Sequence, residues 1–219
     1  QAEKIIGLSL KNITESNKKN LFPATKIWTP MNNMGMKQFE DSLDLWNINK
    51  FSLIQVHNLV NYDSHFELLK NLKKKGKIKY LGVTTSHGSR HEKLIKIMKN
   101  DEIDFVQFTY NILDDEAEKY LLPLAKEKRL AVIINRPFQG GNLFKLSKNK
   151  KIPKWISDYG INTWSELYLK FIISHPDVTC VIPATSKTKH MNENMQSQFG
   201  RLLNQDERLK IKEYYKNLI

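Results

Sequence analysis

The apolar residues of this chain gather in short, nearly continuous runs that alternate with longer amphipathic stretches. Residues 51–57 (FSLIQVH) and 130–135 (LAVIIN) are two such runs. Short apolar runs of this kind are typical of strands buried on both faces of a sheet. The pattern predicts six strands, over residues 21–28, 51–57, 78–84, 103–109, 130–135 and 178–182.

The stretches between these strands carry apolar residues at helical spacing. In residues 64–75 the pattern ends in three lysines followed by Gly76, a combination that favours a helix C-terminus. Helices are predicted over residues 1–11, 37–45, 64–75, 89–99, 115–128, 163–174 and 206–218, with helical spacing also through His190 and Asn194 and a longer loop over 136–158.

A leading helix followed by six strand–helix units predicts a parallel sheet covered on both faces. An open doubly wound sheet often carries a Gly-rich first turn, and no G-x-G-x-x-G occurs in the chain. A (β/α)8 barrel needs eight units and typically about 250 residues. We therefore expect an α/β fold, a (β/α)8 TIM barrel of which this chain supplies about strands three to eight. It is expected to be one domain over residues 1–219, incomplete at its N-terminus.

The composition bears on where in the cell the protein is expected. No run of roughly 18 apolar residues occurs, which argues against a membrane span, and the opening QAEKIIGLSLKN does not read as a signal peptide. The single cysteine, Cys180, allows no internal disulfide. Because it lies in an apolar run, we expect it to be a buried small hydrophobe. A reducing, cytoplasmic location fits.

The formal net charge is +12, from 35 cationic and 23 anionic side chains. Only five of the cationic residues are Arg, the residue that most often recognises nucleic-acid bases. Aromatic residues, which would stack on bases, do not alternate with the cationic residues. Lysine clusters at 73–79 and 145–154 fall in expected helix ends and loops. A solvated Lys-rich surface is the preferred interpretation, with no nucleic-acid or membrane partner. The oligomeric state stays open.

Polar side chains stand at the end of each predicted strand, where parallel barrels collect their functional groups. Each has a structural alternative: His57 as a core histidine, Lys26 as a surface lysine. Six consecutive polar strand ends nevertheless favour a site. They are Lys26 with Trp28, the one apolar member; His57 with Asn58; Thr84, Thr85 and Ser86; Gln107 and Asn111; Asn135 and Arg136; and Thr185, Ser186 and Lys187.

The last strand end has a shape suited to an anion. In residues 178–194 (VTCVIPATSKTKHMNEN), Pro183 stops the strand, and small residues, hydroxyls and a lysine precede a helix. Free backbone N–H groups at a helix N-terminus favour anions. The alternative is an ordinary strand–helix turn.

From residue 1 to about residue 200 the chain resembles the aldo-keto reductases, a family of NADPH-dependent barrel enzymes. Order and spacing of six motifs carry the resemblance: ATKIW (24–28), LIQVHN (53–58), KKKGKIKYLGVTTS (73–86), FVQFTYN (105–111), INRPFQGGNLF (134–144) and VIPATSKTKHMNEN (181–194).

The resemblance implies catalytic roles at two positions and a substrate pocket beside them. Lys26 matches the lysine that lowers the pKa of a catalytic tyrosine, and His57 matches the histidine that orients and polarises the substrate carbonyl. Trp28 and Asn58 would border the substrate.

It also implies a set of cofactor contacts. Thr84 and Thr85 replace the Ser-Asn pair that, with Gln107, holds the nicotinamide carboxamide. Asn135 stands where an aromatic ring often stacks on the nicotinamide, with Phe138 close by, and Arg136 adds charge beside the pyrophosphate. The adenosine half would contact Thr185, Ser186, Lys187, His190, Glu193 and Asn194.

Two departures bear on the choice of cofactor. Ala184 stands where the family commonly has Lys or Arg, and His190 stands where it commonly has Arg. The expected binding of a 2′-phosphate is therefore weaker. Because the hydroxyls of Thr185 and Ser186 supplement Lys187, NADPH is still favoured over NADH.

The family's acid, a tyrosine, is not in this chain. In the pattern D-x-x-x-x-Y-G-x-[AS]-E, the opening QAEKIIG matches the segment after Y-G. The resemblance therefore implies the tyrosine two residues before Gln1 and a catalytic Asp upstream of it. A tyrosine, whose ordinary pKa is about 10, needs a nearby ammonium to donate a proton near neutrality. The expected function is reduction of a small aldehyde or ketone by NADPH. The alternative is a dinucleotide-binding module without turnover, in a regulatory or subunit role.

Overall fold

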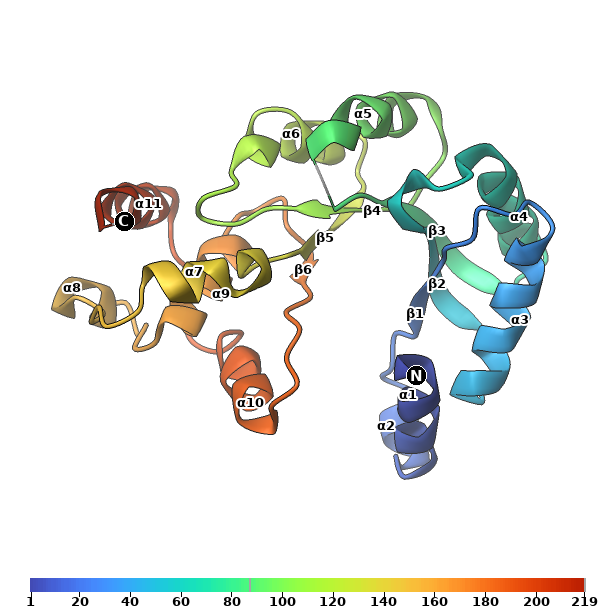
Figure 1. Cartoon of the computed structure of the whole chain (residues 1–219), viewed down its shortest axis with the longest axis horizontal. Coiled ribbons are helices and arrows are strands. Elements are labelled where there is room, and N and C mark those ends of the chain that lie inside the picture. Colours follow the sequence, from blue (N-terminus) through green and yellow to red (C-terminus); the bar gives the residue numbers. More distant parts are fainter. Residues whose placement is uncertain (87, 219) are drawn as a thin grey trace. The chain divides into compact units, whose positions relative to one another are not determined.

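A computed structural model of the chain describes residues 1–86 and 88–218 (Figure 1). The chain divides into two compact units. Residues 1–85 and 101–105 form the first unit, and residues 86–100 together with those from 106 onward form the second. The prediction of a single domain over residues 1–219 stays a prediction.

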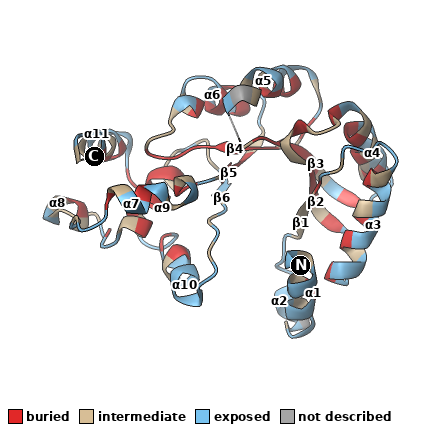
Figure 2. Ribbon diagram, viewed as in Figure 1, coloured by how far each residue is buried: buried red, intermediate tan, exposed pale blue. Residues whose placement is uncertain are grey.

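The first unit contains three parallel strands in sequence order. In this register Lys26 lies beside Gln55, and Gln55 lies beside Gly82. The apolar side chains of β2 and the inward face of α4 form the core of the unit, and residues such as Phe51 and Leu69 are fully buried (Figure 2). Its elements are α1 (Ala2–Lys11), α2 (Glu15–Lys18), β1 (Ala24–Ile27), α3 (Met34–Trp46), β2 (Phe51–Val56), the 3-10 turn η1 (His57–Leu59), α4 (Tyr62–Lys74) and β3 (Ile78–Thr84).

The second unit carries the remaining strands, and β5 pairs with β6 in parallel, with Ile133 beside Cys180. Its core includes Phe108, Ile134 and Phe171, all fully buried. Its elements are η2 (Gly88–Arg90), α5 (His91–Asn100), β4 (Phe105–Thr109, with Phe105 in the first unit), η3 (Glu116–Glu118), α6 (Leu121–Glu127), β5 (Ala131–Asn135), η4 (Gln139–Gly141), α7 (Asn142–Leu146), α8 (Lys154–Ser157), α9 (Trp164–Ile173), β6 (Cys180–Val181), α10 (Thr188–Gln196) and α11 (Gln205–Leu218).

The order of strands and helices agrees with the sequence-based expectation, but every strand except β3 is shorter, β1 and β6 the most. Strand β1 begins at Ala24 because Pro23 has no N–H to donate to a ladder. Strand β6 spans only Cys180–Val181, although single backbone hydrogen bonds from Thr179 and Ile182 extend its pairing with β5.

Several helices also differ from the expectation. The helix predicted over 115–128 is divided into η3 and α6, and Pro123 lies in the first turn of α6, where a missing N–H costs little. The loop predicted over 136–158 contains η4, α7 and α8. The short helix α2 was not expected.

The prediction that Cys180 is buried is wrong, because the side chain is exposed. Within the described part of the chain, β6 pairs only with β5, so its other edge has no strand partner. An apolar run in the sequence does not reveal whether both edges and faces of a strand are covered.

Helix α1 packs unusually close to α3. A Cβ atom at Gly7 would lie 1.9 Å from the carbonyl oxygen of Leu45, so only glycine allows this approach. The carboxylate of Glu3 also accepts hydrogen bonds from Thr25 Oγ1 (2.6 Å) and Ser42 Oγ (3.1 Å). These contacts tie the first turn of α1 to the strand that carries Lys26.

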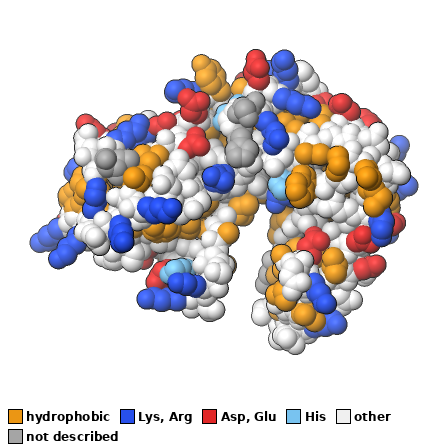
Figure 3. Space-filling view, in the orientation of Figure 1, with side chains coloured by type: hydrophobic (Ala, Val, Ile, Leu, Met, Phe, Trp, Pro, Cys, Tyr) orange, Lys and Arg blue, Asp and Glu red, His pale blue; other side chains and the backbone are white. Residues whose placement is uncertain are grey.

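Lys and Arg side chains are scattered over the visible surface in Figure 3, as the Lys-rich composition predicts. Across the described residues, no helix combines the length and the apolar character that a membrane crossing requires.

Candidate functional site

The predicted site residues fall into two groups, one in each compact unit. The first group comprises Lys26, Trp28, His57, Asn58, Thr84 and Thr85. The second comprises Gln107, Asn135, Arg136, Phe138, Thr185, Ser186, Lys187, His190, Glu193 and Asn194.

Lys26 is a partly buried cation on β1. Burial lowers the pKa of its ammonium group. Among the residues that the structure describes, none forms an ion pair with it. Gln55, its neighbour in the register, is 2% exposed and donates from Nε2 to the Val83 carbonyl (3.4 Å). Sequence reasoning missed Gln55, although its amide interrupts the apolar residues of the run FSLIQV.

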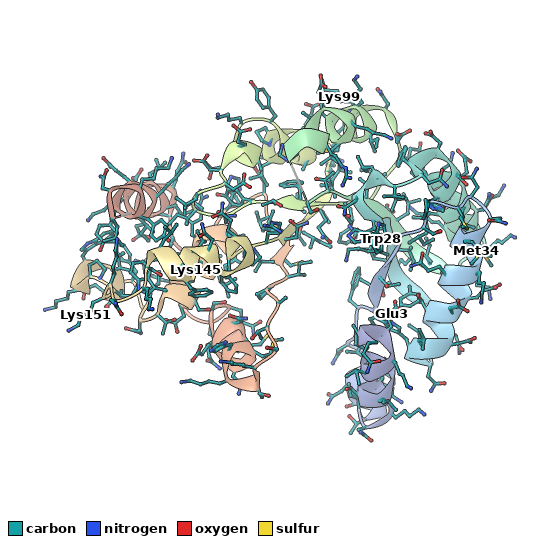
Figure 4. All side chains as sticks on the ribbon, viewed as in Figure 1. Glu3, Trp28, Met34, Lys99, Lys145 and Lys151 are labelled. Atoms are coloured by element: carbon teal, nitrogen blue, oxygen red, sulfur yellow. The ribbon has the colours of Figure 1, made fainter. Side chains whose placement is uncertain are left out.

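His57 is presented by a sharp turn at the end of β2. Asn58 and Leu59 adopt positive φ values of 53° and 54°, which are uncommon for residues other than glycine. The N–H of Asn58 donates to Thr84 Oγ1 at 2.9 Å, so the buried hydroxyl of Thr84 anchors the turn. The ring of Trp28, labelled in Figure 4, lies 5.7 Å from the His57 ring at an angle of 57°.

In the second unit, buried polar side chains at the end of β4 contact the end of β5. Gln107 and Thr109 share one face of β4, and both are buried. Thr109 Oγ1 lies 2.8 Å from Asn135 Oδ1. Asn111 Nδ2 donates to the carbonyl of Arg136 (3.3 Å). Sequence reasoning missed Thr109, whose signal was its two-residue spacing from Gln107.

A cavity of about 500 Å³ lies beside the loop that follows β5. Gly140 and Gly141 bend this loop with φ values of 66° and 91°, a conformation that favours glycine. The lining residues are Asn135, Arg136, Pro137, Phe138, Gly140, Gly141, Phe144, Ile182 and Ala184.

A second cavity, of about 310 Å³, lies against α10. Its wall combines two aromatic rings with polar side chains, and five of its residues were selected from the sequence. Ser186 and Lys187 are exposed at the start of α10, where Thr185 Oγ1 accepts from the Lys187 N–H (3.1 Å). The lining residues are Phe138, Phe144, Ser165, Ala184, Thr185, His190, Glu193 and Asn194.

Asn194, which lines this second cavity, carries an unpaired donor. The side chain is 6% exposed, and its Oδ1 accepts from Ser165 Oγ at 2.8 Å. In the described chain its Nδ2 is buried and has no hydrogen-bond partner. Since an unsatisfied buried donor costs about 1–3 kcal/mol, a ligand with an acceptor atom here would be stabilised. Ser165, buried on α9, was not expected from the sequence.

The aromatic wall of both cavities rests on a cluster of hydroxyl groups. Phe138 and Phe144 pack against the ring of Tyr168, with centroids 6.4 and 5.5 Å away. The Tyr168 hydroxyl lies 2.9 Å from the Leu143 carbonyl and 3.0 Å from the hydroxyl of Tyr215 on α11. Helices α7, α9 and α11 therefore jointly support the cavity wall.

The two tyrosines nearest to strand ends have structural partners. Tyr62 donates to Asp101 (2.7 Å), and Tyr110 donates to Glu118. Burial, followed by the neighbouring carboxylates, raises the pKa of Tyr62, and burial is also the main cause that raises the pKa of Tyr110. Neither phenol is therefore suited to donate a proton near neutrality.

Comparison with known proteins gives consistent matches. A sequence model of the aldo/keto reductase family matches residues 1–216. The uncharacterized oxidoreductase YqkF of Bacillus subtilis (strain 168) is 22% identical over 241 residues, covering 94% of this chain and 76% of the relative. The uncharacterized oxidoreductase C215.11c of Schizosaccharomyces pombe is 25% identical over 179 residues, covering 80% of this chain and 52% of the relative.

The structure resembles the aldo-keto reductase AKR11C1 from Bacillus halodurans. Its holo form gives a TM-score of 0.75 at 23% identity, and its apo form gives 0.74 at 22%. Each match covers 96% of this chain and 76% of that chain. At this identity the likeness shows the fold alone. It confirms the predicted α/β class, with six parallel strands that match most of a (β/α)8 barrel.

Proposed function

Because the chain belongs to the aldo/keto reductase family, we propose that it reduces a small aldehyde or ketone with NADPH. The observation that carries this proposal is the ammonium of Lys26, which burial desolvates on β1 and which no described carboxylate neutralises. A desolvated cation at a strand end lowers the stability of the fold unless it interacts with an anion or with negative charge that develops during a reaction.

The described residues fit a dinucleotide. The cavity against α10 offers aromatic walls and the unpaired Nδ2 of Asn194, which suits a ring nitrogen of adenine. We assign the 2′-phosphate to Thr185, Ser186, Lys187 and His190, the adenine to Glu193 and Asn194, the pyrophosphate to Arg136, and the nicotinamide end to Thr84, Thr85, Gln107, Asn135 and Phe138. The cofactor would supply the hydride.

The chain's own residues have distinct tasks in this proposal. The hydride forms a new C–H bond at the carbonyl carbon, and the oxygen gains negative charge that a proton then neutralises. His57 donates a hydrogen bond to that oxygen. The charge of Lys26 lowers the pKa of the general acid that delivers the proton, which is the tyrosine that the family resemblance implies. Trp28 and Asn58 border the substrate.

A nucleotide titration with charge variants tests the cofactor assignment. We expect Lys187→Ala and His190→Ala each to raise the Kd for NADPH about tenfold, because each loses a polar contact to phosphate. The Kd for NADH should change by less than about twofold. The matched control is Lys99→Ala, an exposed lysine on α5 (Figure 4). Equal effects on both nucleotides would contradict the 2′-phosphate assignment.

A binding module without turnover is the second candidate function. It is favoured by Asn135, whose Oδ1 contacts Thr109 and which replaces the aromatic ring expected to stack on the nicotinamide. NADPH binding without any carbonyl-dependent loss of NADPH absorbance would support this candidate. Turnover would exclude it.

We place the protein in the cytoplasm, with a small carbonyl compound as its partner and no nucleic-acid or membrane partner. A single cysteine without a possible internal disulfide supports a reducing compartment. Steep salt dependence of binding to nucleic acid would contradict this assignment.

A further inference from the structure

The segment that carries Trp28 is held by side chains from two helices. The N–H of Trp28 donates to Gln38 Oε1 of α3 at 2.9 Å. The carbonyl of the next residue, Thr29, lies 2.8 Å from Nε2 of His65 on α4. The backbone is therefore fixed on both sides of the Trp28 Cα atom. We propose that His65 is a positioning residue that holds the Trp28 ring beside His57, and that it thereby sets which carbonyl compounds fit; this proposal rests on the proposed function.

The hydrogen bond to Thr29 fixes the role of Nε2 in His65. A carbonyl oxygen only accepts, so Nε2 is the donor. The side chain is 0% exposed, and among the described residues Nδ1 has no hydrogen-bond partner. An aliphatic side chain would fill such a site without burying an unpaired nitrogen. The hydrogen bond to Thr29 accounts for the presence of an imidazole at this position.

The packing around His65 is matched to an imidazole. A Cβ atom at Gly35 of α3 would lie 2.8 Å from His65 Nδ1 and 2.9 Å from Leu68 Cδ2. The absence of a side chain at Gly35 therefore leaves the space that the ring occupies. Helix α3 supports the same segment twice, through Gln38 and through this space.

Trp28 is the side chain that this arrangement positions. It is 62% exposed, yet its ring lies 5.7 Å from the ring of His57. An exposed indole ring is held only weakly by packing. The position of the Trp28 ring therefore depends on the position of its backbone. If the backbone of Trp28 and Thr29 shifts, the wall that the indole forms beside His57 shifts with it.

The test uses the full chain labelled with 5-fluorotryptophan, with the Trp28 resonance assigned by its loss in Trp28→Phe. In His65→Leu we expect the 19F resonance of Trp28 to move and broaden while those of Trp46, Trp155 and Trp164 stay in place. His65→Gln should restore it, because the amide can donate to Thr29. His91→Leu, a histidine substitution in the other unit, is the matched control.

Kinetics give the second readout. For His65→Leu we expect KM for benzaldehyde to rise about fivefold or more, kcat and the Kd for NADPH to stay within about twofold, and KM for acetaldehyde to change less. A purely structural role would lower the activity toward both aldehydes alike.

If His65→Leu does not fold, Gly35→Ala provides a second test. Its Cβ atom would push the His65 ring away from its place, while every residue that makes a hydrogen bond in this segment is retained. An unchanged Trp28 resonance in the folded variant would overturn the proposal. If the unaltered protein neither binds NADPH nor reduces a carbonyl compound, the proposed function fails, while the 19F resonance still decides whether His65 positions Trp28.

Discussion

At the scale of single residues, surroundings determine what each polar group can do. Lys26 and Lys79 are both strand lysines, but Lys79 is exposed while burial lowers the pKa of Lys26. Below its lowered folded-state pKa, Lys26 stays charged in the folded and the unfolded protein, so folding must desolvate the ammonium. That cost falls as pH rises from the folded-state pKa toward the ordinary value of 10.5.

The variant Lys26→Met tests both consequences. We expect carbonyl reduction to fall by about 10²-fold or more, because the general acid loses its neighbouring charge. The melting temperature at neutral pH should stay equal or rise, because no ammonium is desolvated. Initial rates and thermal melts provide the measurements, with Lys79→Met as the control. Undiminished activity would remove Lys26 from the proposed mechanism.

Sequence reasoning could select these residues only in part. Polar side chains that follow an apolar run, such as His57 and Gln107, are visible as pattern breaks. His65 gives no such signal, because its role depends on a carbonyl and a glycine that lie far away in the sequence. The hydrogen bond between Ser165 and Asn194 is hidden for the same reason.

At the scale of elements, close approach decides how α1 lies on α3. Glycine in a helix costs about 1 kcal/mol relative to alanine, so Gly7 lowers the intrinsic stability of α1. The carbonyl of Leu45 explains its presence, because any Cβ atom at Gly7 would overlap that oxygen.

We therefore expect Gly7→Ala to destabilise the protein by about 1–3 kcal/mol, although alanine is the better helix former. Urea unfolding measures the change. Lys4→Ala, at an exposed position of the same helix, should have little effect. Stabilisation by Gly7→Ala would show that the close approach of α1 and α3 is absent in solution.

Helix α9 begins with a capping box, in which the Thr163 side chain accepts from the Glu166 N–H and Glu166 bonds back to the Thr163 N–H. We expect Thr163→Ala to lower the free energy of unfolding by about 1 kcal/mol. Asn162→Ala, one residue earlier and exposed, is the control for chemical denaturation. Equal losses in the two variants would contradict a specific cap.

At the scale of the whole molecule, the pattern of apolar runs was sufficient for the number, order and parallel pairing of the strands, because the inner strands β2, β3 and β4 are mostly buried. The pattern gave a wrong prediction for the burial of Cys180. Whether the edge of a strand is covered depends on which strands lie beside it, and an apolar run does not contain that information. The pattern also failed over 136–158, where α7 and α8 are too short to show a helical period.

A charged network fastens α11 to the second unit. Arg208 and Lys212 contact Glu118 at 2.8 and 2.9 Å, and Lys212 contacts Asp115 at 2.6 Å. Burial alone would raise the pKa of Glu118, but hydrogen bonds from Tyr110, Lys212 and Arg208 outweigh it and lower the pKa. Burial also opposes the lowered pKa of Asp115, which hydrogen bonds from Lys212 and Lys216 produce.

A lowered carboxyl pKa stabilises the fold above the ordinary carboxyl pKa, and this stability is lost as pH falls through the lowered value. We expect Glu118→Gln to cost about 2 kcal/mol at neutral pH and to flatten the loss of stability in acid. Chemical denaturation over a pH series measures both effects, with the exposed Glu116→Gln as control. If the free energy of unfolding of Glu118→Gln falls in acid as steeply as that of the unaltered protein, this network is not the source of the acid sensitivity.

The hydroxyl cluster around the Leu143 carbonyl has a consequence for biosynthesis. Tyr215 on α11 contacts Tyr168, which supports the rings of Phe138 and Phe144 at the cavity wall. The ribosome makes these two phenylalanines long before it makes Tyr215. A nascent chain that has not yet released α11 therefore lacks one of the supports of the cavity against α10. If the proposed nucleotide binds in this cavity, its affinity would depend on the completion of α11. A product truncated before Gln205 would then bind it more weakly and be exposed to cellular proteases.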